Sequence, residues 1–143
     1  MRSANSTALA MADRSVFSMS RAIDFFVNVL GFRLVEDVPS VTNDGRPKRW
    51  VVVRPEGGTT GILLARADGA GQLAVAGKQC ADRVGFFLRV DDFEEAYRRM
   101  TGAGVEFVSE PRVEPYGQVA VFLDVEGNRW DLLGPPPAGQ SEA

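Results

Sequence analysis

Hydrophobic and polar residues follow two periodicities along this chain, and their order occurs twice. Residues 92–100 place apolar side chains at helical spacing on one face and charged side chains on the other, which predicts a short amphipathic helix. Residues 18–29 carry a comparable stripe. The apolar members are Phe93, Ala96, Tyr97 and Met100 in the later helix and Met19, Ala22, Phe26 and Val29 in the earlier one.

A glycine follows each predicted helix, and three β-prone runs come after it. Between the last two runs of each set, Gly57-Gly58 and Gly127-Asn128 predict hairpin turns. The predicted strands are 31–35, 50–53 and 61–65 in the first set and 104–108, 119–123 and 129–133 in the second. Residues 84–90 predict a strand that opens the second set, and the same offset places an opening strand of the first set at residues 11–17. Residues 1–12 are interpreted as an arm or a leading strand.

This repeat predicts an α+β fold made of two βαβββ modules. Each helix covers one sheet face, so the economical arrangement packs the modules into a curled mixed sheet whose open faces enclose a shared, ligand-sized cleft. We expect residues 1–143 to form a single domain. Its predicted parts are module one (11–66), a linker (67–82), module two (83–134) and a proline-rich C-terminal tail (135–143).

Composition narrows the possible partners. The formal charge is −3, and the 16 Lys and Arg residues are scattered, which argues against nucleic-acid binding. No run of apolar residues is long enough to predict a membrane span. The single cysteine, Cys80, cannot form an internal disulfide, and we expect a cytoplasmic protein because no export segment is recognisable.

Four short motifs resemble one family. They are Arg21–Phe26 running on to Val29–Phe32, Val90–Phe93, Pro115–Gly117 and Gly127–Leu132. In this order, over roughly residues 15–134, the chain resembles the vicinal-oxygen-chelate superfamily of glyoxalases, bleomycin-resistance proteins and extradiol dioxygenases. The resemblance implies the βαβββ fold and a homodimer. It also implies a cleft in which enzymes of the family bind a divalent metal through His, Glu or Gln on the first and last strands of each module.

The chain departs from this pattern because it contains no histidine. A two-histidine iron centre cannot be built, so extradiol dioxygenase chemistry is not expected. Arg89 stands where similar sequences often carry histidine, and Asp131 stands where they carry a carboxylate ligand; the two side chains could pair with each other. We therefore predict no cofactor. The alternative is a divalent ion (Mg, Mn, Ni or Zn) on Asp131 with Asp13, Glu114 or Gln118.

The expected ligand contacts combine charged anchors and aromatic rings. Arg89 suits an anionic group of a ligand, and Asp131 is the candidate catalytic residue if a reaction occurs. Trp50 and Tyr116 lie beside loops, where amphipathic rings often border pockets, whereas core packing is the favoured interpretation of Phe87 and Phe122. The predicted ligand-binding set is Arg89, Asp131, Trp50, Tyr116, Phe87, Phe122 and Gln118.

These residues lead to one hypothesis and two alternatives. The first is a metal-independent binder that holds a small planar or anionic molecule between aromatic walls. An alternative is a divalent-metal-dependent lyase or isomerase that resembles glyoxalase I. A further alternative is a metal-free enzyme in which Asp131 removes a proton next to a carbonyl while Arg89 stabilises the enolate.

Overall fold

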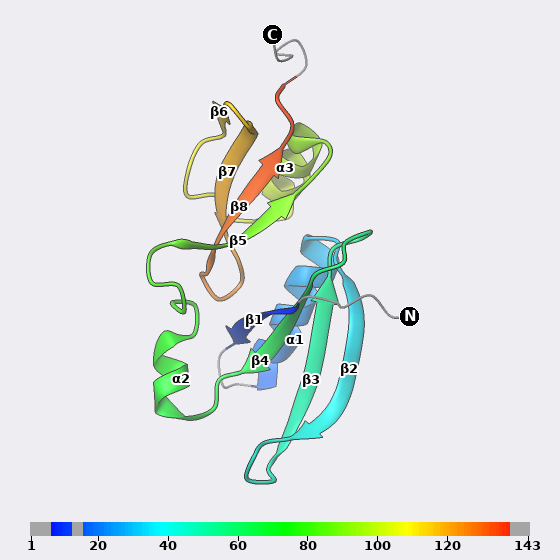
Figure 1. Ribbon diagram of the computed structural model, residues 1–143, viewed down its shortest axis with the longest axis vertical. Coiled ribbons are helices and arrows are strands. Elements are labelled where there is room, and N and C mark those ends of the chain that lie inside the picture. Colours follow the sequence, from blue (N-terminus) through cyan, green and yellow to red (C-terminus); the bar gives the residue numbers. More distant parts are fainter. Residues whose placement is uncertain (1–6, 13–15, 138–143) are drawn as a thin grey trace. The chain divides into compact units, whose positions relative to one another are not determined.

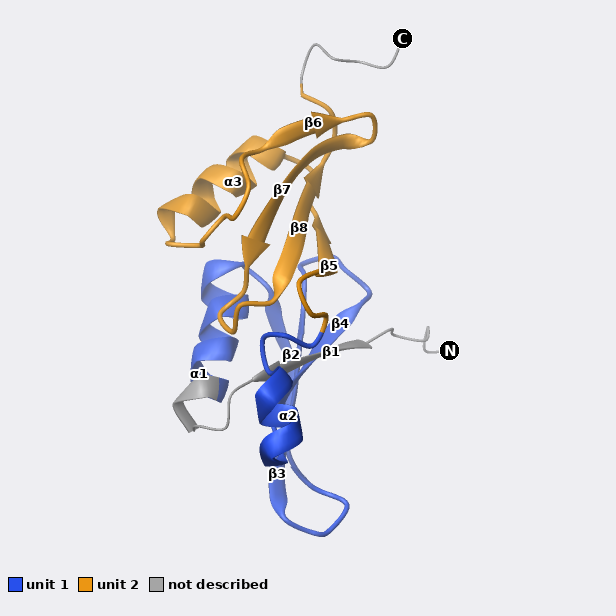
Figure 2. Cartoon of the chain, turned by 90° about the vertical axis from the view of Figure 1, so that its left-hand side faces the viewer, with its two compact units in different colours: residues 1–79 blue, residues 80–143 orange. Residues whose placement is uncertain are grey.

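The computed structural model describes residues 7–12 and 16–137, with side chains from residue 19 onward. The chain forms two compact units, residues 1–79 and 80–143 (Figure 2). Each unit contains a four-stranded mixed sheet, and the chain is an α+β protein as the alternating patterns predict (Figure 1). The two sheets have the same strand order, so the internal repeat seen in the sequence is confirmed as a structural repeat.

Unit 1 has its sheet in the order β1-β4-β3-β2, with β1 parallel to β4 and the other pairs antiparallel. Its elements are β1 (Thr7–Ala12), α1 (Val16–Asp24), η1 (Phe25–Val29), β2 (Arg33–Val41), β3 (Pro47–Arg54), β4 (Gly61–Arg66) and α2 (Gly69–Val75). The opening strand expected at residues 11–17 is wrong, because β1 lies farther upstream and α1 already begins at Val16. The short apolar run of residues 8–11 pairs with apolar β4, and this pairing decides the position of the strand.

The first helix buries the predicted stripe and then changes its pitch. Met19, Ala22 and Phe26 are buried, as expected from helical spacing. In η1 the backbone hydrogen bonds join residues five apart instead of four, since the Leu30 N–H donates to the Phe25 carbonyl at 2.9 Å. The extra residue rotates the following position, so Leu30 is buried while Val29 is only half-buried.

Unit 2 repeats this architecture in the order β5-β8-β7-β6, with β5 parallel to β8. Its elements are β5 (Val84–Arg89), α3 (Phe93–Gly102), β6 (Arg112–Glu114), β7 (Gly117–Leu123) and β8 (Arg129–Gly134). The carboxylate of Asp92 caps α3 by accepting a hydrogen bond from the Glu95 N–H. The predicted apolar face of α3 is confirmed: Phe93, Ala96 and Met100 are buried, and Tyr97 is half-buried.

The strand predicted at residues 104–108 is wrong in its extent. That segment makes only an isolated bridge, Phe107 with Phe122, while β6, the edge strand of the sheet, comes later in the chain. The ladder is interrupted because the Val121 N–H donates to the Ser109 hydroxyl at 2.9 Å and so is not available to a strand carbonyl. The segment predicted as a linker, 67–82, contains the helix α2, none of whose residues is buried.

The turn between β7 and β8 is closed by a buried carboxylate. Asp124 Oδ1 accepts hydrogen bonds from the N–H groups of Glu126 and Asn128, both at 3.0 Å. Its Oδ2 accepts from Asn128 Nδ2 at 3.2 Å and from Trp130 Nε1 at 3.0 Å. The predicted turn at Gly127-Asn128 is confirmed, and the carboxylate attaches it to an indole of the core.

Two glycines of unit 2 allow close packing. Gly117 has φ +138°, and a Cβ there would lie 2.1 Å from the Gly134 carbonyl oxygen. A Cβ on Gly134 would lie 2.6 Å from the Cβ of Phe93. The end of β8 therefore approaches α3 and β7 as closely as it does only because both positions lack a side chain.

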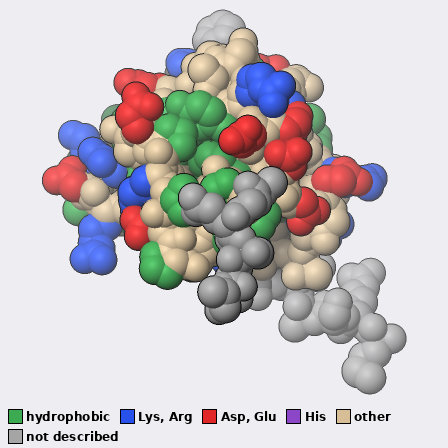
Figure 3. All heavy atoms as spheres, turned by 90° about the horizontal axis from the view of Figure 1, so that it is seen from above, with side chains coloured by type: hydrophobic (Ala, Val, Ile, Leu, Met, Phe, Trp, Pro, Cys, Tyr) green, Lys and Arg blue, Asp and Glu red, His purple; other side chains and the backbone are tan. Residues whose placement is uncertain are grey.

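The surface mixes residue types. On the face drawn in Figure 3, hydrophobic side chains reach the surface between acidic and basic ones. Among the described residues, no helix is both long enough and apolar enough to cross a membrane.

Candidate functional site

Unit 2 presents an open sheet face that carries an aromatic ring and a carboxylate. Along β5, Phe86 and Leu88 point into the core beneath α3, whereas Phe87 is 67% exposed and Arg89 is exposed. Phe87 is in parallel register with Asp131 of β8, so these two side chains share the face opposite α3. The burial pattern of β5 confirms the predicted alternation, in which Phe87 and Arg89 share one face, and the assignment of that face to a ligand cleft stays a prediction.

Asp131 is half-buried on this face, and its burial raises the pKa of its carboxyl group. The positive charge of Arg112 opposes that increase. The expected ion pair between Arg89 and Asp131 is not formed within the described part of the chain, where Arg89 lies in register with Leu133. Asp131 is therefore a carboxylate whose protonated form is favoured by desolvation.

Arg112 is the charged residue of this face that the sequence did not identify. It begins β6 in register with Val119, and its Nε donates to Glu114 Oε1 at 2.7 Å. This hydrogen bond, and a weaker interaction with the 60%-exposed Tyr116, raise the pKa of the Arg112 guanidinium. Sequence reasoning placed the strand too early, at residues 104–108, so Arg112 fell outside every predicted element.

Two residues of the predicted ligand-binding set lie elsewhere in unit 2. Phe122 is fully buried and packs against Phe107 and Trp130, so its ring belongs to the core and does not reach the open face. Gln118 lies on the helix side of the sheet, where its Nε2 donates to the Pro135 carbonyl at 3.2 Å. A ligand held on the face of Phe87 and Asp131 would contact neither side chain.

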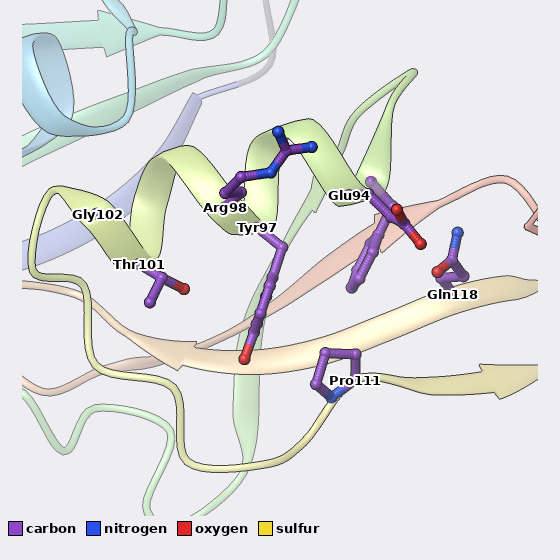
Figure 4. A pocket seen from close by; sticks show the side chains of 8 residues that line it. Glu94, Tyr97, Arg98, Thr101, Gly102, Pro111 and Gln118 are labelled. Carbon is purple, nitrogen blue, oxygen red and sulfur yellow. The ribbon is translucent and has the colours of Figure 1, made fainter.

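Gln118 lines a hollow of about 570 Å³ beside α3. In Figure 4, Tyr97 extends from α3 toward the segment that carries Pro111, and Glu94 and Gln118 lie at one end. Tyr97 also packs against Phe107, with ring centroids 4.5 Å apart. Its lining combines apolar side chains such as Phe93 with polar ones such as Arg98.

Trp50, the remaining aromatic residue of the predicted set, lies in unit 1. Its side chain is 38% exposed and lines a hollow of about 620 Å³, where β4 ends while the hairpin of β2 and β3 continues. Leu63 and Ala65 provide apolar lining, and Lys48 and Arg66 provide positive charge. Both its volume and its mixture of an aromatic ring with a few charges are typical of a small-molecule site.

Among the described residues, those proposed for the metal alternative are not grouped into a ligand set. Asp13 lies outside the described residues, and the Glu114 carboxylate is occupied by Arg112. Within the described ranges, no three Asp, Glu or Cys side chains are grouped closely enough to hold a metal ion. Because the sequence also lacks histidine, the donors present on these faces do not fit a divalent ion, and the prediction of a metal-free protein remains to be tested.

Comparison with known proteins gives consistent matches. The family model described as Glyoxalase/Bleomycin resistance protein/Dioxygenase superfamily matches residues 8–132. An uncharacterized protein of Shewanella frigidimarina is 49% identical over 113 residues, which cover 78% of this chain and 82% of that protein.

Two solved structures from Streptomyces sp. CB03234 are also similar. A glyoxalase/bleomycin resistance protein is 30% identical, with a TM-score of 0.64 and coverage of 90% of this chain and 99% of that one. TnmS3, an antibiotic binding protein, is 27% identical, with a TM-score of 0.66 and coverage of 94% and 99%.

Proposed function

Because the chain belongs to the Glyoxalase/Bleomycin resistance protein/Dioxygenase superfamily, we propose that it binds a small planar or anionic molecule without a histidine-type metal site. The observation that carries the proposal is the partly exposed indole of Trp50 on a hollow of about 620 Å³ in unit 1. The exposed ring of Phe87 beside Asp131 offers a second contact surface in unit 2. Similarity to an antibiotic binding protein supports binding rather than catalysis.

Tryptophan fluorescence tests this proposal directly. Trp50 is 38% exposed and Trp130 is 2% exposed, so a ligand in the hollow changes the emission of the first indole and leaves the second as an internal reference. The titrants are bleomycin-type glycopeptides, mitomycin-like quinones and aromatic acids. We expect at least one to quench saturably with a stoichiometry of one or more per chain, and the Trp50→Phe variant to lose that signal. If no member of the panel perturbs Trp50, the proposal is wrong.

A second candidate function is metal-free proton transfer by Asp131. The observation that favours it is the burial of this carboxylate, since a raised pKa brings a carboxylate closer to the strength of a useful general base. Arg89 belongs to the same face, where its guanidinium could stabilise an enolate. The Asp131→Asn variant separates this candidate from simple binding.

The assay for this candidate is exchange of methyl protons of 4-acetylbenzoate for deuterium in D₂O, followed by NMR. A protein that accelerates exchange, and loses the acceleration in Asp131→Asn while still binding the compound, is an enzyme of this kind. Exchange at the rate of buffer alone eliminates the candidate and leaves the binding proposal intact.

Metal analysis of the purified protein, with and without added Mg, Mn, Ni or Zn, tests the metal-dependent alternative. One bound ion per chain would favour the metal-dependent lyase or isomerase over the metal-free binder.

The proposal also includes a cytoplasmic homodimer. Its support is the family resemblance for the dimer, and the single cysteine for a reducing compartment. Sedimentation equilibrium at micromolar concentration measures the oligomeric state, and a monomer throughout that range would contradict the homodimer.

A further inference from the structure

The hollow beside Trp50 brings four basic residues together at one end of unit 1. Arg46, Lys48 and Arg49 come from the start of β3 and the turn before it, and Arg66 ends β4. Trp50 lines the same hollow. Four cations and a partly exposed indole in the lining of one hollow suggest a ligand that is both aromatic and negatively charged.

Two of the four cations are already neutralised. Arg46 binds the Asp68 carboxylate through both terminal nitrogens, at 3.1 and 2.7 Å, and its Nε binds Asp44 at 3.0 Å. Arg49 donates to both oxygens of the Asp37 carboxylate, from Nε at 3.1 Å and from one terminal nitrogen at 2.6 Å. Such bidentate pairs fix the guanidinium groups in place and leave them little capacity for a further anion.

Lys48 and Arg66 are different. Among the residues that the structure describes, no carboxylate lies within ion-pair distance of either side chain, although both line the hollow. Counted over the described residues, these two cations together with Arg46, Arg49 and their three carboxylates have an excess of one positive charge. The unpaired cations can therefore accept an anionic group without first breaking an internal ion pair.

We infer that this hollow selects an aromatic anion, with the ring against the Trp50 indole and the anionic group on Lys48 and Arg66. This inference rests on the proposed binding function and specifies its ligand class. The two cations supply charge complementarity, and the indole supplies a flat apolar surface that suits a planar ring. Arg46 and Arg49 act as positioning residues, because their ion pairs hold the turn and β3 in the arrangement that forms the hollow.

A matched pair of probes tests the charge requirement. 2-Naphthoate and 2-naphthamide have the same ring and nearly the same shape, but only the first is negatively charged. Calorimetric titration of the full chain at low salt should give at least tenfold tighter binding for the naphthoate, about 1.4 kcal/mol. The difference should shrink at 0.5 M salt, because exposed charges are screened.

Three substitutions assign the contacts. Lys48→Gln and Arg66→Gln should each weaken naphthoate binding five- to tenfold and leave naphthamide binding unchanged, whereas Trp50→Ala should weaken both. The matched control is Lys78→Gln, which removes an exposed lysine outside the hollow and should change neither. Unchanged thermal melting of each variant shows that the loss does not come from unfolding.

The outcomes separate this inference from the proposed function. If both probes bind equally and both need Trp50, the chain is a binder of planar molecules but the inferred preference for anions is wrong. If naphthoate does not bind at 1 mM, the inference is overturned whatever the fluorescence panel shows. If the whole panel also leaves Trp50 unchanged, the proposed function fails with it.

Discussion

Replacing Asp124 by alanine should destabilise unit 2 more than almost any other polar substitution. This carboxylate is buried and accepts four hydrogen bonds, two from turn N–H groups and two from the side chains of Asn128 and Trp130. Alanine leaves two buried side-chain donors without an acceptor. Each such loss costs about 1–3 kcal/mol, so we expect a decrease of about 4 kcal/mol in the free energy of unfolding.

The Asn variant gives an internal scale. Asp124→Asn keeps one oxygen acceptor but places an amide N–H₂ group against donors, so its cost should be about half, roughly 2 kcal/mol. Asp91→Ala removes an exposed aspartate of the same unit and should change stability by no more than about 0.5 kcal/mol.

Urea denaturation in a Trp50→Phe background measures these differences. The chain contains two tryptophans, so Trp130 then reports alone on unit 2, and its emission shifts to the red when the core opens. The physical reasoning is refuted if Asp124→Ala lies within about 1 kcal/mol of the parent, below the cost of one unsatisfied buried group. An Asn variant as unstable as the Ala variant would show that charge, rather than the number of acceptors, is decisive.

Three further predictions concern packing and titration. Gly134→Ala should cost about 1–3 kcal/mol in thermal or urea unfolding because its Cβ meets α3, whereas Gly102→Ala, with open space around it, should be neutral or slightly stabilising. Phe122→Ala should cost about 3–5 kcal/mol while Phe87→Ala changes stability little, and the reverse order would show that their environments are misassigned. Burial raises the pKa of Asp131, so the ionised form of this carboxyl group is penalised in the folded state. Asp131→Asn should therefore melt at a higher temperature than the parent at pH 7. This difference in melting temperature should disappear in acid, where the parent carboxyl group is protonated. An advantage that is the same at every pH would contradict this assignment.

Periodicity predicted those parts of the fold that depend on burial of one face. The helix stripe of Phe93, Ala96 and Met100 and the alternation around Phe87 required no knowledge of distant residues. The position of β6 did require it, because a hydroxyl of Ser109 takes an N–H of β7 and the ladder resumes only afterwards. The π turn at η1 could not be predicted from the sequence either, since one inserted residue leaves the composition of the apolar stripe unchanged.

The sequence predicted which types of residue could contact a ligand better than it predicted which of them lie together in the fold. Trp50 and Asp131 were chosen as ligand contacts because of their chemistry and their position on strands or beside loops, and whether they contact a ligand remains a prediction. The ion pairs that leave Lys48 and Arg66 free depend on partners up to 22 residues apart, such as Arg46 and Asp68, which no local pattern relates. Arg112 was missed for the same reason that β6 was misplaced.

In each unit the first strand pairs in parallel with the last, so each sheet can be completed during synthesis as soon as its own last strand has been made. The sheet of unit 1 needs no residue beyond Arg66, so it can close while later codons are still being read. At about 5–20 residues per second, the rest of the polypeptide emerges over roughly 4–15 s, far longer than a small domain needs to fold. The nascent chain can therefore carry a finished N-terminal sheet before β8 exists, and the N-terminal half has little opportunity to pair its strands with those of the second.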